Sequence, residues 1–263
     1  MARTLVICMF GLLCACTVSA QKKTDLEIEG LKGRVRSVRV EWARLTVEGG
    51  KLVASPRRPQ RLTIYDEQGN KTESMIFKHD GSILTKSVYG KDAQGNLVTA
   101  SFDGNGKLIR RTVMMLNAQE QFPDVFVFGP NGEPLERSVR TRRADGRLTE
   151  EAIYDANGAL LYKNVFSHDD QGKQTEFANY NSAGKLTQKT VWLNDGGIHS
   201  IKYDERGNLW YESIHRASTI EDIDPQGNWT ERHTPEKTTQ EGHTREYVGV
   251  TYRAIEYHTA KKP

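Results

Sequence analysis

The chain has 263 residues, a formal net charge of +3 at pH 7, 27% charged residues and 37% hydrophobic residues. Basic and acidic residues are mixed along the whole chain, which is typical of solvated faces and excludes the concentrated basic patch of a nucleic-acid-binding protein. All three cysteines lie at or before Cys16, so a chain that loses its leader has no disulfide, no thiolate nucleophile and no cysteine-based metal site.

Residues 1–20 have the features of a secretory signal peptide. Arg3 supplies a positive start, the apolar run from Leu5 to Val18 is short for a membrane span, and small residues precede Gln21. We therefore expect cleavage before Gln21 and an exported protein, periplasmic or extracellular, with no transmembrane span afterwards. The alternative is an outer-membrane lipoprotein, because Leu13-Cys-Ala-Cys resembles a lipobox with Cys16 as the lipidated residue.

The rest of the chain divides into four segments. Residues 21–30 are polar and predict a flexible tether, and residues 31–60 predict an N-terminal capping strand followed by a proline-containing loop. Residues 61–232 form a regular repeat array, interrupted at 213–223 by an excursion with room for one helical turn. Residues 233–263 predict a mobile polar loop and then a closing strand, which pairs with an edge of the array or with the first strand.

The array is built on a turn motif, seen as Ile153-Tyr-Asp-Ala-Asn-Gly-Ala-Leu and in near copies that begin at Tyr65 and Tyr203. Its glycines recur every 26 residues in two interleaved series, which indicates a repeat architecture with two turns in each unit. The residues assigned to these turns are Asp66, Gly69, Gly81, Gly95, Asp103, Gly106, Gly132, Gly146, Asp155, Gly158, Gly172, Gly184, Gly197, Asp204, Gly207, Asp224 and Gly227.

The chemistry of the motif predicts antiparallel hairpins. The aspartate bonds backbone amides ahead of it, and the glycine supplies the positive φ that the turn needs. The segments between turns are rich in Val, Thr, Tyr and Leu and leave roughly nine residues, about 30 Å, for each strand. We expect an all-β fold, an antiparallel meander of double-hairpin repeats. Because about 12–16 strands exceed the ~10 that an open sheet holds, the sheet should curl into a half-barrel or two packed layers.

These turns resemble the YD repeats of the RHS (rearrangement hotspot) family, and more closely those of small secreted bacterial proteins with tandem Tyr-Asp-x-x-Gly-Asn and Tyr-x-x-x-Gly-Lys-Leu hairpins. The resemblance extends over residues 30–258 and includes the ending from Asp224 to Tyr257. It implies the hairpin architecture and no activity. The toxin-enclosing shell of large RHS proteins is not implied, because this chain is far shorter.

Catalytic and metal-binding chemistry find little support. The repeated aspartates do not have the spacing of a calcium-binding loop, and the seven histidines form no ligand pair. There is no nucleophile elbow and no phosphate loop. Glu150 and Glu151 are adjacent, so on a strand they face opposite sides and do not form a glycosidase pair. We expect no enzyme activity, no cofactor and no metal.

Late aromatic residues are the strongest sign of binding. Trp210, Tyr211 and Trp229 gather where the repeat spacing breaks, and exposed aromatic faces suit sugars. The competing interpretation is that they plug the end of the sheet. The arginine-rich run from Arg137 to Arg147 is interpreted as a solvated strand face, and its alternative is contact with an anionic glycan or phospholipid head groups.

Three hypotheses follow for function. The favoured one is a non-enzymatic surface for an envelope protein or a polysaccharide, with a carbohydrate-binding module as its specific form. The second is a lipid-anchored structural spacer. The third is an enzyme of unrecognised type, whose polar groups would have to converge in a cleft. The free edges of a meander also make a strand-edge homodimer an open alternative.

Overall fold

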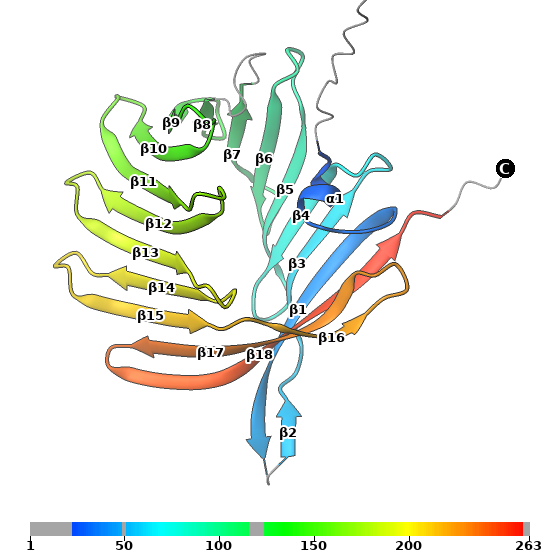
Figure 1. Ribbon diagram of the computed structural model, residues 1–263. Helices are drawn as coiled ribbons and strands as arrows, with labels where there is room; N and C mark the ends of the chain where they lie inside the picture. Colours follow the sequence, from blue (N-terminus) through cyan, green and yellow to red (C-terminus); the bar gives the residue numbers. More distant parts are fainter. Residues whose placement is uncertain (1–22, 49–50, 116–123, 260–263) are drawn as a thin grey trace, which may run out of the picture.

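The computed structural model describes residues 23–48, 51–115 and 124–259, so the expected signal peptide and Cys16 lie outside the described residues. One short helix, α1 (Asp25–Ile28), precedes a series of strands (Figure 1). In this part of the chain, no helix has the length and hydrophobicity needed to cross a membrane. The strands are β1 (Val35–Glu48), β2 (Lys51–Ala54), β3 (Arg58–Tyr65), β4 (Lys71–Phe77), β5 (Ile83–Lys91), β6 (Leu97–Asp103), β7 (Leu108–Met114), β8 (Val125–Phe128), β9 (Pro134–Arg142), β10 (Leu148–Asp155), β11 (Leu160–His168), β12 (Gln174–Asn181), β13 (Leu186–Trp192), β14 (Ile198–Tyr203), β15 (Leu209–His215), β16 (Thr219–Ile223), β17 (Trp229–Gln240) and β18 (His243–Tyr257).

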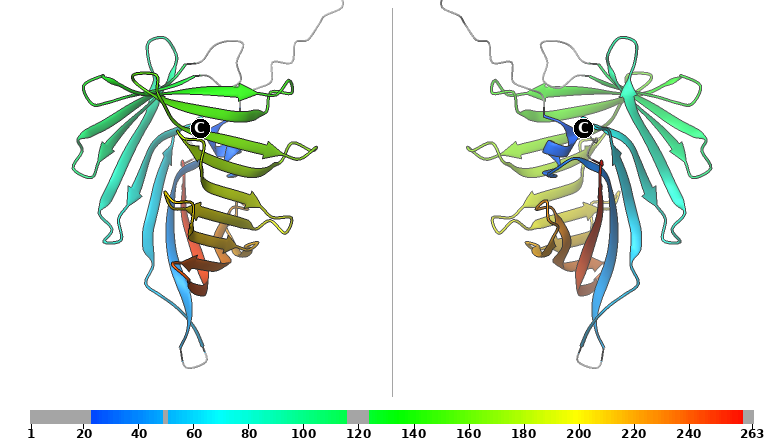
Figure 2. Two further views of the ribbon diagram at one scale, coloured as in Figure 1. Left: turned by 90° about the vertical axis from the view of Figure 1, so that its left-hand side faces the viewer. Right: turned by 90° about the vertical axis from the view of Figure 1, so that its right-hand side faces the viewer.

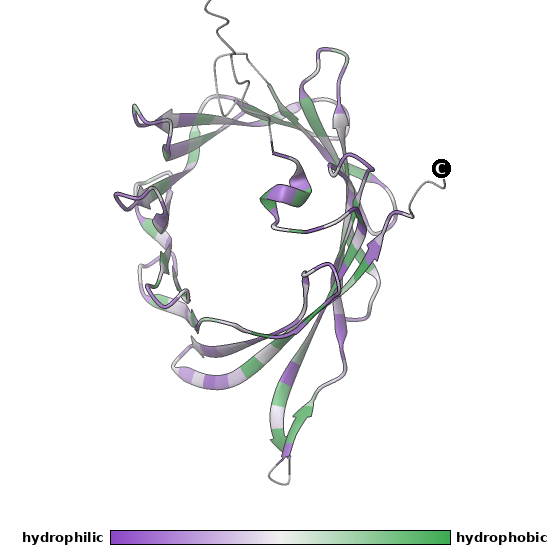
Figure 3. Ribbon diagram, turned by 45° about the vertical axis from the view of Figure 1, so that its right-hand side comes forward, coloured by the Kyte–Doolittle hydropathy of each residue, from purple (hydrophilic) through white to green (hydrophobic). Residues whose placement is uncertain are grey.

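The strands form one antiparallel sheet that closes on itself. Of its 18 strands, β2 and β16 lie outside the ring, which leaves 18 − 2 = 16 strands around it. Closure comes from β1, which pairs with β3 on one side and with β18 on the other, from Val35 opposite Tyr257 to Leu45 opposite Val248. The hairpins follow one another around this ring (Figures 2 and 3).

The all-β antiparallel meander is therefore confirmed, whereas the predicted half-barrel or two-layer sheet is wrong. Each hairpin adds the same right-handed twist, so a meander of this length curves back to its own start. The two terminal strands then pair with each other, as one of the two pairings expected for the closing strand. Closure also pairs the backbone groups at the two edges of the meander. The expected strand-edge homodimer depended on those edges being free.

The turn chemistry follows the sequence prediction. In the turn after β10, Gly158 has φ +84° and donates its N–H to the Asp155 carbonyl at 3.1 Å. The Asp155 carboxylate accepts from the N–H groups of Asn157 at 2.9 Å and Ala159 at 2.8 Å. One assignment shifts by a residue: Gly196 (φ +83°), and not Gly197, has the positive φ in the turn between β13 and β14.

Three segments that were expected to be irregular are ordered instead. The predicted tether contains α1, which Thr24 caps and whose Leu26 is only 8% exposed. The excursion expected at 213–223 contains the end of β15 and the added strand β16, with no helical turn. The loop expected after residue 233 is mostly the long strand β17, because it pairs with both β15 and β18.

The position of α1 defines the inner face of the barrel. Figure 3 shows α1 within the ring of strands. Leu26 of this helix packs in one cluster with Val38 and Val40 of β1 and Tyr65 of β3. Side chains of directly opposed residues in an antiparallel pair share a face, and faces alternate along each strand. The strand registers carry this inner face around the ring through Thr63, Ser74, Ser87, Ser101, Thr112, Ser138, Glu151, Asn164, Asn179, Thr190, Ser200, Ser213, Thr238, Gly249 and Arg44.

Candidate binding surface on the inner wall

The outer wall carries a series of cross-strand ion pairs. Glu150 lies on the outer face, one residue from the inward Glu151, and pairs with Lys163 at 3.2 Å. One unit later, Lys189 pairs with Glu176 at 2.7 Å. A barrel that crosses a membrane has an apolar band about 25 Å tall on its outside. Charged residues in the middle of successive strands interrupt such a band on this part of the outer wall.

The inner wall is polar as well, and its most connected group is centred on Glu151. Its Oε1 accepts from Ser138 Oγ and Arg140 Nε, both at 2.8 Å, and its Oε2 accepts from Asn164 Nδ2 at 3.2 Å. Asn179 Nδ2 continues the chain by donating to Asn164 Oδ1 at 2.8 Å. Burial acts to raise the pKa of Glu151, but these donors and the positive charge of Arg140 hold it below its usual value.

A second inner group combines arginines with aromatic rings. It lies where the first and last strands meet, on the inner faces of β1, β3, β17 and β18, and we call it the arginine–aromatic wall. Its members are Trp42, Arg44, Arg61, Trp229, Arg232, Tyr247 and Arg253.

The core of this wall is Trp229, which has two guanidinium groups against its ring. The Cζ atom of Arg253 is 3.6 Å from the ring centroid, and that of Arg232 is 4.4 Å from it. The Nε atoms of both arginines are buried and have no hydrogen-bond partner among the described residues. Burial, and then the positive charge of Arg232, lower the pKa of Arg253 to about 10. Arg253 therefore stays protonated at neutral pH, although its surroundings disfavour the charge.

Glu29, whose charge favours the protonated form of Arg253, is shared with other groups. Glu29 follows α1 and accepts a hydrogen bond from the Tyr65 hydroxyl at 2.6 Å, and it also forms an ion pair with Lys71. Burial and the Glu29 carboxylate raise the pKa of Tyr65, which keeps this phenol protonated as the donor. Because Glu29 already has a cation and a phenol beside it, the inner surface around Arg253 keeps a net positive charge.

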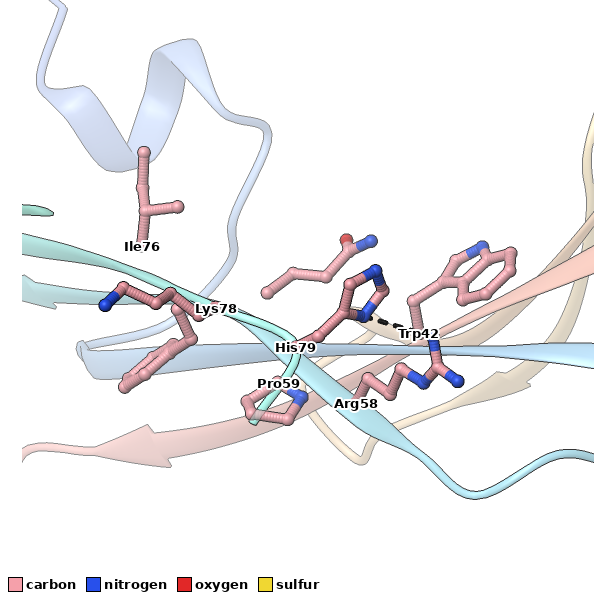
Figure 4. A pocket seen from close by; sticks show the side chains of 8 residues that line it. Trp42, Arg58, Pro59, Ile76, Lys78 and His79 are labelled. Atoms are coloured by element: carbon pink, nitrogen blue, oxygen red, sulfur yellow. Dashed lines mark hydrogen bonds between the residues drawn. The ribbon is translucent and has the colours of Figure 1, made fainter. Parts of the chain in front are cut away.

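The other end of the wall is an aromatic corner. Trp42 and Tyr247 meet edge to face at 6.3 Å, and Arg44 Cζ lies 4.2 Å above the Tyr247 ring. Trp42 also lines a pocket with Arg58 and His79, whose Nδ1 lies 3.0 Å from Arg58 Nη1 (Figure 4). Burial and hydrogen bonding to Glu236 raise the pKa of Tyr247 to about 12. The wall thus offers stacking surfaces and cations along its length.

The structure does not bring the three predicted binding aromatics together. Trp210 is 45% exposed and its ring lies 6.3 Å from that of Tyr211. Tyr211 lies opposite Gln240 of β17, whereas Trp229 begins that strand. Eleven residues of extended strand separate Gln240 from Trp229, which is roughly 35 Å. Trp229 therefore lies far from the other two, although Tyr211 shares its inner face through Ser213.

The other candidate residues from the sequence, the possible metal ligands and the arginine run, do not form a common site either. Within the described ranges, no group of three or more His, Cys, Asp or Glu side chains is placed to hold a metal ion. The arginine run divides between the two faces of β9: Arg140 points inward to Glu151, while Arg137 lies on the other face and pairs with Asp124 at 3.0 Å.

Sequence reasoning missed the arginine–aromatic wall because its members lie up to about 200 residues apart along the chain. The only sequence signal was local: Val40, Trp42 and Arg44 alternate on one face of the first strand. This pattern predicts a shared surface only once the strand pairing is known. In the structure, Val40 of this strand lies opposite Arg61 on one side and opposite Arg253 on the other.

Comparisons with known proteins add little. No protein-family model and no curated protein matches the chain. Among the solved structures that match is a porin-like protein from Bacteroides uniformis, with 9% sequence identity and a TM-score of 0.47, covering 86% of this chain and 98% of that one. With this identity and overlap, nothing about function follows from the likeness. The resemblance to RHS-type repeat proteins stays a prediction.

Proposed function

We propose that this protein is an exported, non-enzymatic β-barrel of the cell envelope that stays in water and binds a ligand on its inner wall, at the arginine–aromatic wall. The observation that carries this proposal is the distribution of side chains between the two faces. The outside has paired charges, which need no partner, whereas the inside gathers arginines, three of which have a buried Nε without a hydrogen-bond partner among the described residues. Buried donors without partners are costly, so they indicate a surface that a ligand completes.

The location in water is tested by fractionation and conductance. The protein without residues 1–20 contains every described residue, and we expect it to purify without detergent. We also expect it to leave planar lipid bilayers electrically silent. Recovery only in detergent, together with stable channel conductance, would show that the outer wall faces lipid and would contradict the proposal.

Ligand binding is tested with a panel of neutral and acidic polysaccharides. Binding should be lost in Trp42→Ala, which removes an inner aromatic surface, and kept in Trp210→Ala, which removes an outer one. Circular dichroism confirms that both variants are folded. Retained binding in the Trp42 variant, or loss only in the Trp210 variant, would place the site elsewhere.

The second candidate function is carbohydrate binding on the outside, at Trp210. It is favoured by the 45% exposure of Trp210, which alternates with the inward Tyr211 and so faces outward. The same two variants decide between the two sites. If no polysaccharide binds to the folded parent, the lipid-anchored spacer becomes the better hypothesis. Its signature is membrane association that Cys16→Ala abolishes.

A further inference from the structure

We propose that Arg232, Arg253 and Arg61 form a binding site for an oxyanion, a carboxylate or phosphate group of the ligand, with Trp229 as its backing surface. This inference rests on the proposed function and adds the chemical class of the ligand. The three arginines belong to β3, β18 and β17, which lie in the order β3, β1, β18, β17 along the sheet.

The strand registers place the three arginines in a row across the sheet. Val40 of β1 lies opposite Arg61 of β3 on one side and opposite Arg253 of β18 on the other. Because neighbouring strands are about 4.8 Å apart, the backbones of these two arginines are separated by roughly 10 Å. Arg232 comes from the next strand, β17, where it lies opposite Thr251. Long side chains rooted at this spacing can converge on one group.

The charge balance of the row is unusual for a structural cluster. Both Arg232 and Arg61 oppose the protonated form of Arg253, whereas Glu29 and Tyr65 are the groups that favour it. None of the three arginines is in an ion pair among the described residues, and Glu29 is committed to Lys71. A folded protein gains nothing from holding like charges together, so an anion is the missing partner.

Trp229 fixes the positions of two of the arginines before a ligand binds. Contact with the indole holds the guanidinium groups of Arg253 and Arg232 against a single ring. Guanidinium donors match the geometry of carboxylate and phosphate oxygens, often with two parallel bonds. A fixed pair of such groups therefore selects an oxyanion over a neutral sugar hydroxyl.

The test uses titration calorimetry on the protein without residues 1–20. The probes are inorganic phosphate and two matched oligosaccharides, one of neutral galactose units and one of galacturonate units. Calorimetry on the parent should show saturable binding of phosphate, of the acidic oligosaccharide, or of both. The two probes distinguish a phosphate ligand from a carboxylated glycan.

Substitutions of the arginines test whether the anion binds at this row. Arg253→Gln and Arg232→Gln should each weaken it by about tenfold or more, the effect of losing a hydrogen bond from a charged group. Arg245→Gln is the matched control, since Arg245 is exposed on the same face of β18 and lies opposite Thr238, away from the row. The control should bind as the parent does.

Two results would overturn the inference. One is that the folded parent shows no saturable binding of either anion with a Kd tighter than about 1 mM. The other is that Arg245→Gln weakens binding as much as Arg253→Gln does, which would indicate diffuse charge attraction. If only the neutral oligosaccharide binds, and Trp42→Ala abolishes that binding, the proposed ligand site on the inner wall would be supported. The proposal that the ligand is an oxyanion would be wrong.

Discussion

The opposite faces of β10 allow a sharp test of the barrel, because Glu150 and Glu151 are neighbours in sequence and yet lie on different walls. We consider the changes Glu151→Gln and Glu150→Gln, which remove the same charge at adjacent positions. Glu151 is 17% exposed and holds Arg140, which is 18% exposed. Glu150 is 38% exposed and its partner Lys163 is 37% exposed.

The magnitudes differ because the two pairs differ in solvation. Breaking a buried pair by neutralising one partner costs about 3–5 kcal/mol, because the other charge stays out of water. Glutamine keeps the shape and an acceptor for Ser138, so we expect Glu151→Gln to lower the free energy of unfolding by about 3 kcal/mol. The surface pair of Glu150 is screened by solvent, so Glu150→Gln should cost about 0.5 kcal/mol.

The assay is urea unfolding followed by circular dichroism at pH 7 and again in acid. The folded pKa of Glu151 lies below the usual 4.5, so its contribution is fully present above that pH and is lost as the pH falls through the folded pKa. The parent should therefore approach Glu151→Gln in stability in acid. Equal costs at both positions, or a difference that does not shrink in acid, would refute the assignment of the two faces.

Three further predictions concern α1, the turns and the outer wall. Leu26→Ala should lower the free energy of unfolding by about 2–4 kcal/mol, since Leu26 is 8% exposed within a core cluster; a thermal melt showing no loss would contradict the docked helix. Asp155→Ala removes the acceptor of two turn amides and should cost about 1 kcal/mol in urea unfolding, whereas Asp170→Ala, in the middle of another turn, should cost less. Trp210→Ala should change stability by less than about 0.5 kcal/mol, because the side chain is 45% exposed; a larger loss would show that it caps the core.

The sequence by itself determined the hairpins of this protein. Glycine periodicity and the Asp-x-x-Gly turn are local properties, because a positive φ and an Asx-type bond involve only a few neighbouring residues. The turns at Gly69 and Gly158 formed as the sequence predicted. The opposite orientation of Glu150 and Glu151 is likewise local, because alternation is a property of any strand.

Only the tertiary structure decided closure and, with it, the candidate site. Twist accumulates over the whole meander, so no single repeat shows whether the last strand meets the first. Once β18 pairs with β1, residues such as Arg61 and Arg253 come to flank Val40 although almost 200 residues separate them. Pairing of β17 with β18 likewise brings Trp229 to Arg253, and pairing of its other end with β15 leaves Trp229 far from Tyr211. A surface assembled from both ends of a chain cannot be read from either end alone, because its spacing is set by hydrogen-bond register between strands and not by distance along the sequence.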